Sequence, residues 1–247
     1  MLAVPNTLEE AVLQAKEATK LALEANIGRI QVELVVPEIA LQAQSLALEF
    51  TSLFEDPSSL KVIFPDTGAA ALARRDWGET PFKVSDLGSR ATSVETKISV
   101  EDQGFLLVRP SSVEVEVVEK LCDLAGDRPV VLLIPQLENV SVVGIGYAAR
   151  QLRERFLSTL ESVYYFKPLE GAAILRSYPS PWNVYLETET GYELIASEPQ
   201  KPMGQTLELI FAKATATDGD DKQNNNVYSK KSGFFAGIQQ FLRALSQ

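Results

Sequence analysis

Apolar and polar residues follow two alternating periods along the first two thirds of the chain, one typical of strands and one typical of helices. Residues 6–25 repeat apolar positions at helical spacing, and residues 29–37 pass from alternation into a continuous apolar run. Further helical patterns cover 40–54, 66–78, 112–126 and 147–163, between strand-like runs at 59–65, 81–87, 104–110 and 128–137. Strands that alternate with helices predict an α/β fold, with a mixed, mostly parallel central sheet and helices on both faces.

The pattern changes in the last third of the chain. Short strand-like segments are separated by turn residues, at 164–170, 172–179, 182–189 and 191–198. They predict antiparallel strands, which either extend the same sheet or form a small meander beside it. From Lys213 the sequence becomes polar and loses its periodicity. We therefore expect a single α/β domain over residues 1–212, a flexible polar linker over 213–232 and an amphipathic helix over 233–247.

The expected C-terminal helix has a one-sided apolar face, preceded by Lys230 and Lys231. Such a helix can dock on its own domain, in the groove of a partner or on an anionic membrane surface, and the pattern fits all three. Its expected contact residues are Phe234, Phe235, Ile238, Phe241 and Leu242.

The residue types present limit the chemistry of the protein. The formal net charge of −10 disfavours nucleic acid as the main partner, because a phosphate backbone is repelled. The chain has no histidine and one cysteine, Cys122, which excludes Ser-His and Cys-His nucleophile pairs, an intrachain disulfide and His- or thiolate-based zinc sites. Cys122 is expected to be a buried, inert thiol. We assign no catalytic residue, no metal site and no cofactor.

The stretch from Phe64 to Gly78 contains the first candidate site. Asp66, Thr67 and Gly68 follow a strand and open a helix, where parallel sheets bind ligands and free amides accept anions. Thr67 and the Gly68 amide suit a phosphate or carboxylate, whereas Asp66 opposes one. The same residues are also those of an ordinary helix start with Asp66 or Thr67 as N-cap, so both interpretations stay open.

Arginines supply the remaining candidates. Arg109 and Arg176 both follow apolar strands, so they either converge on an acidic ligand or bind a loop carboxylate. A second group of candidates lies near the end of the alanine-rich helix. It contains arginine and tryptophan, which often contribute most of the binding energy at protein interfaces. This candidate contact surface comprises Arg74, Arg75, Asp76 and Trp77.

Glycine patterns do not support a nucleotide-binding loop of the common kinds. Residues 144–149 match G-x-G-x-x-A, but no acidic residue stands about 20 residues later, where dinucleotide-binding folds need one. The pattern G-x-x-x-x-G-K-[ST] does not occur, which excludes an ordinary P-loop enzyme.

Several of these segments, in this order, resemble the domain of unknown function 1995 family. The similar segments are 64–78, 104–115, 128–140, 153–169 and 171–197, and the resemblance covers roughly Pro5 to Ala212. This family occurs in cyanobacteria and plastids, includes a plant stromal protein that assists photosystem II accumulation, and is also found joined to a plastid adenylate kinase. The resemblance transfers no catalytic residue.

The resemblance implies a non-enzymatic accessory factor for the biogenesis or maintenance of the photosynthetic apparatus. Its expected partners are photosynthetic membrane proteins or their assembly factors, and its expected location is cytoplasmic, peripheral to the thylakoid membrane. The first residues resemble neither a secretory signal nor a transit peptide, as expected for a bacterial copy. The alternative is a module or enzyme that binds a phosphorylated metabolite or nucleotide around Asp66–Gly68.

Overall fold

A computed structural model of the chain describes residues 3–88, 92–137 and 147–217. Its centre is a nine-stranded sheet in the order β3-β2-β4-β5-β1-β6-β7-β8-β9. Strands from β3 to β6 pair in parallel, and β6 to β9 pair antiparallel. This confirms the α/β class and shows that the antiparallel strands extend the same sheet. The strands are β1 (Arg29–Leu34), β2 (Leu60–Phe64), β3 (Lys83–Asp86), β4 (Gly104–Val108), β5 (Val130–Leu133), β6 (Glu161–Leu169), β7 (Ala172–Ser177), β8 (Trp182–Thr188) and β9 (Gly191–Glu198).

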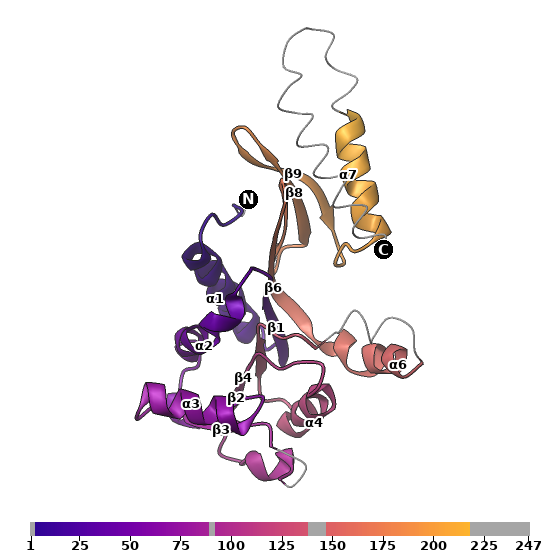
Figure 1. Ribbon diagram of the computed structural model, residues 1–247. Helices are drawn as coiled ribbons and strands as arrows, with labels where there is room; N and C mark the ends of the chain where they lie inside the picture. The colour runs from indigo at the N-terminus through magenta and orange to yellow at the C-terminus, as the bar shows by residue number, and fades with distance from the viewer. Residues whose placement is uncertain (1–2, 89–91, 138–146, 218–247) are drawn as a thin grey trace.

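Helices cover both faces of the sheet (Figure 1). On the first face, one core joins the sheet to α1 (Leu8–Glu24), α2 (Ala43–Thr51) and α3 (Thr67–Trp77). On the second face, a separate core joins it to α4 (Val115–Ala125) and to the end of α6 (Tyr147–Arg155). A third core lies between α7 (Gln205–Thr217) and the antiparallel strands.

The apolar runs of the sequence form the centre of the sheet. Every residue of β2, β4 and β5 is buried, as expected for parallel strands that are covered on both faces. β1 alternates instead, so that Ile30, Val32 and Leu34 enter the first-face core. The same alternation leaves Gln31 and Glu33 on the second face.

Helix boundaries follow the expected capping residues. Thr7 caps α1 by accepting a hydrogen bond from the Glu10 N–H, and Asp66 caps α3 by accepting one from the Ala69 N–H. α4 stops before Gly126, which has a positive φ of 62° that glycine adopts at little cost. The helix stop expected at Gly126 is confirmed.

Two expected boundaries are wrong. The helical pattern over 147–163 ends as an α-helix at Arg155, and Glu161–Val163 already belong to β6, where pairing with β1 overrides helical periodicity. α7 was not expected at all. It runs through Thr217, so Lys213–Thr217 are helical rather than part of a linker.

In its described part, the connection between β3 and β4 contains only one short 3-10 helix, Val94–Lys97. A buried cluster of charged side chains holds this connection in place. The Asp102 carboxylate is fully buried. It accepts hydrogen bonds from Lys61 Nζ at 2.6 Å and from Lys83 Nζ at 2.8 Å. It also accepts from the Ser99 N–H at 2.8 Å. Burial by itself would raise the pKa of Asp102, but these hydrogen bonds outweigh burial and lower the pKa below its ordinary value.

Candidate contact and ligand site at the carboxyl edge of the sheet

After the adjacent strands β2 and β4, the chain passes to opposite faces of the sheet at its carboxyl edge. β2 leads into α3 on the first face and then to β3, whereas β4 leads into α4 on the second face and then to β5. This divergence creates a crevice of the kind in which open α/β sheets bind ligands. Asp66 follows β2 and Arg109 follows β4, so these two candidate residues flank the crevice.

A groove of about 500 Å³ lies at this place, on the first face between α3 and the segment that contains α2 and the 3-10 helix Ile39–Gln42. Both walls carry exposed leucines: Leu41 is 78% exposed and Leu72 is 42% exposed. Small apolar residues and three charged residues complete the lining, which includes Ala40, Ala43, Pro65, Ala69, Asp66, Asp76 and Arg109. The groove is therefore apolar on its walls and charged at a few points.

Asp66 has a structural role in this groove. Its Oδ1 accepts from the Ala69 N–H at 2.9 Å, which confirms the N-cap interpretation. Thr67 begins α3 and is exposed, and a Cβ at Gly68 would lie 3.0 Å from the Asp66 carboxylate. The capping contact occupies one of the amides that an anion would need, and the carboxylate charge opposes a second anion.

Arg109 is the exposed cation of the groove. Its backbone has a φ of 52°, in the left-handed region that arginine rarely adopts, and its N–H is fixed by a 2.8 Å hydrogen bond to the Leu133 carbonyl. It forms no ion pair with any residue in the described ranges. Arg109 thus presents an unneutralised positive charge beside apolar walls.

Prolines shape the rest of the carboxyl edge. The adjacent strands β2, β4, β5 and β1 are each followed within three residues by a proline and then a polar residue. These pairs are Pro65–Asp66, Pro110–Ser111, Pro135–Gln136 and Pro37–Glu38. Proline has no N–H, so these loops lack the run of amide donors that phosphate-binding loops present. Asp66 and Glu38 contribute carboxylate acceptors to this edge, and Arg109 contributes the one positive charge among these residues.

Residues 5–209 match the model of the family described as Domain of unknown function (DUF1995). The match contains the complete sheet and both walls of the groove. The chain belongs to the DUF1995 family. Because the match ends inside α7, the remainder of that helix and all later residues lie beyond the matched part.

Arg176, the second strand-end arginine, lies elsewhere in the DUF1995 domain. It is on β7, which is separated from β4 by β5, β1 and β6, so it does not converge with Arg109. Its guanidinium pairs with Glu161 and lies 5.2 Å from the centre of the Trp182 ring. Its Nε is buried and has no hydrogen-bond partner among the described residues.

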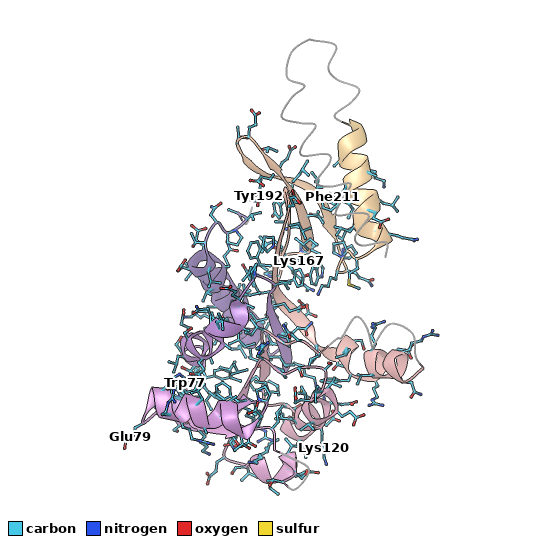
Figure 2. All side chains as sticks on the ribbon, in the orientation of Figure 1. Trp77, Glu79, Lys120, Lys167, Tyr192 and Phe211 are labelled. Carbon is cyan, nitrogen blue, oxygen red and sulfur yellow. The ribbon has the colours of Figure 1, made fainter. Side chains whose placement is uncertain are left out.

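The expected contact surface at the end of α3 is partly engaged within the domain. Arg74 donates a hydrogen bond to the Val84 carbonyl at 2.7 Å, and Trp77 packs against Phe64 and Phe82 with ring centres 5.6 and 5.8 Å apart. Figure 2 shows Trp77 on α3. Arg75 and Asp76 are exposed and pair with each other at 2.7 Å. Asp76 also lines the groove, so this end of α3 contributes to the site chiefly through that residue.

A second polar cluster was not anticipated from the sequence. Lys201, in the loop before α7, pairs with Glu33 at 3.0 Å and lies 4.0 Å from the centre of the Tyr165 ring. Ser162 Oγ donates to the other Glu33 oxygen at 2.8 Å. These contacts fasten the loop to β1 and β6, and the only early signal was the polar alternation of β1.

The structure also bears on Cys122, on the C-terminal contact residues, and on metal and membrane sites. Cys122 is buried, and burial raises the pKa of its thiol to about 12, so it stays protonated at neutral pH. The C-terminal contact residues Phe234, Phe235, Ile238, Phe241 and Leu242 lie outside the described residues. Within the described residues, no group of three or more acidic or cysteine side chains is placed to hold a metal, and no helix is suited to crossing a membrane.

Proposed function

We propose that the protein is a non-enzymatic accessory factor for the photosynthetic apparatus, which contacts membrane-protein components or their assembly factors near the thylakoid surface. The observation that carries the contact role is the open groove at the carboxyl edge, with exposed leucines on both walls. Covering a leucine side chain completely is worth about 1.5–3 kcal/mol, so two such side chains offer a partner a useful share of its binding energy.

The photosynthetic part of the proposal is supported by the family. The chain belongs to the DUF1995 family, and the resemblance of its Pro-Asp-Thr-Gly and Arg-x-x-Pro-x-x-Trp segments implies a role beside the photosystems. A protein that holds a client transiently needs an accessible apolar surface rather than converging catalytic groups. The groove offers such a surface.

Charge reversal of the groove walls tests this proposal. Tagged full-length protein is mixed with solubilised thylakoid membranes, and the recovered photosystem subunits are quantified. Leu41→Glu and Leu72→Glu should each lower recovery roughly tenfold or more, because a carboxylate placed against an apolar partner costs over 1.4 kcal/mol.

Leu13→Glu provides the matched control for this experiment. Leu13 is 66% exposed on α1 and does not line the groove, so recovery should match that of the unchanged protein. If the two groove variants recover as much as this control does, the groove is not the contact surface and the proposal fails.

The second candidate function is a nucleotide or phosphorylated-metabolite site around Asp66–Gly68. It is favoured by one observation, the placement of Asp66 and Arg109 on one groove at the divergence of β2 and β4. A thermal-shift panel of nucleotides and sugar phosphates, with and without magnesium, separates the two functions. A ligand at a hundred times its Kd adds about 2.7 kcal/mol of stability, which raises the Tm measurably, whereas the contact role predicts no shift.

A further inference from the structure

The charged side chains that line the groove differ in whether they have a partner within the protein. The Asp66 carboxylate accepts the Ala69 amide at the positive end of α3, and Asp76 pairs with Arg75 at 2.7 Å. Arg109 has no such partner in the described ranges. Asp66 keeps its negative charge, so an anion is disfavoured at the start of α3. The Arg109 guanidinium is the charged lining group without a partner in the described ranges, and it lies beside the apolar walls.

The backbone at Arg109 does not favour arginine. A φ of 52° suits glycine, and a side chain there is strained. The hydrogen bond from the Arg109 N–H to the Leu133 carbonyl holds this conformation in place, although a residue before a proline normally favours an extended backbone. Arginine at this position contributes no ion pair within the described protein, so its use points outward, to a ligand.

We propose that the groove binds a segment of a partner protein in which an acidic side chain stands beside aliphatic side chains, with Arg109 receiving the carboxylate. The inference rests on the proposed contact function and specifies the chemistry of the partner. Leu41 and Leu72 cover the aliphatic side chains, while the guanidinium forms the paired hydrogen bonds that suit a carboxylate. A nucleotide fits less well because the proline-started loops supply few amide donors for its phosphates.

Selection from a library of short random-sequence peptides tests the inference with a defined probe. The library is displayed on phage and panned on the immobilised full-length protein. The enriched peptides should carry aspartate or glutamate next to aliphatic residues. A synthetic peptide from this set should bind roughly fivefold more weakly when its acid is replaced by the amide, as expected for an exposed ion pair.

Variants of Arg109 give the decisive comparison. Arg109→Glu should reverse the selection toward lysine and arginine, and Arg109→Gly should lose the acid preference while its Tm stays equal or rises. Lys20→Glu is the charge-matched control, because Lys20 is exposed on α1 and lines a different depression at the amino edge of the sheet. Its selected peptides should remain acidic and aliphatic.

The outcomes separate the inference from the function on which it rests. Peptides without an acidic preference, an unchanged preference in Arg109→Glu, or no enrichment at all would overturn the inference, even if photosystem subunits still depend on Leu41 and Leu72. Acidic–aliphatic selection that depends on Arg109, combined with photosystem recovery that ignores Leu72→Glu, would uphold the groove chemistry and reject the photosynthetic client.

Discussion

Asp102 and Arg109 show how two charged residues of the same domain differ in role. Asp102 is fully buried and receives donors from β2, β3 and the chain before β4, so its carboxylate has no room for a ligand. Arg109 is exposed, strained and unpaired in the described ranges. The first arrangement is typical of a residue that holds the fold together, and the second is typical of one that meets a partner.

Asp102→Asn should lower the free energy of unfolding by about 3 kcal/mol at pH 7, because it leaves Lys61 buried without its counter-charge. The folded-state pKa of Asp102 lies below its ordinary value. Its contribution is therefore complete above about pH 4 and is lost as the pH falls through the folded-state pKa. Urea unfolding at a series of pH values should show the two proteins converging in acid.

Glu101→Gln is the control for this measurement. Its side chain is 80% exposed and lies 3.8 Å from Lys83, so its removal should change stability by less than about 1 kcal/mol. A gap between Asp102→Asn and the unchanged protein that persists undiminished at low pH would contradict the role given to Asp102.

At the scale of elements, the alternation of strands and helices was predictable because β2, β4 and β5 are dense apolar runs and because α1 and α3 begin at capping residues. The position of Asp66 before α3 and of Arg109 after β4 followed from the same pattern. The groove did not. Its walls join Leu41 to Leu72, which are remote in sequence, and local periodicity marks each leucine only as an exposed position.

α7 was missed for a related reason. Its buried residues Leu207, Ile210 and Phe211 occupy too short a stretch to stand out before a polar segment. The helix is held by packing on strands β6 to β9 and not by propensity, and this packing becomes visible only once the antiparallel strands have been placed. Phe211 lies between α7 and these strands (Figure 2).

Phe211→Ala should therefore loosen α7 before it affects the rest of the domain. Phe211 is 1% exposed, and removing its ring should cost about 3 kcal/mol. Hydrogen exchange should speed up in α7 while β2 and β4 keep their protection. Leu209→Ala, at a position that is 60% exposed, should leave exchange unchanged. Equal acceleration throughout the sheet would show that α7 is not a separate unit.

At the scale of the whole molecule, the groove and α7 belong to different ends of the sheet. The groove lies at the ends of β2 and β4. α7 packs on β6 to β9, at the other end of the sheet (Figure 1). β2 and β7 are five strand spacings apart, which corresponds to about 24 Å. The groove and the surface covered by α7 are therefore separate parts of the domain.

The chain after Thr217 provides the last prediction. Its apolar residues from Phe234 onward are preceded by Lys230 and Lys231, in a protein whose net charge is −10. We expect a chain that ends at Thr217, where α7 ends, to float with anionic vesicles less than the full chain does.

The shortened chain should still bind the acidic–aliphatic peptides with unchanged affinity, because the groove keeps every lining residue. Equal flotation of both chains would exclude a membrane role for the segment. A loss of peptide binding on truncation would mean that the segment after Thr217 contributes to peptide binding.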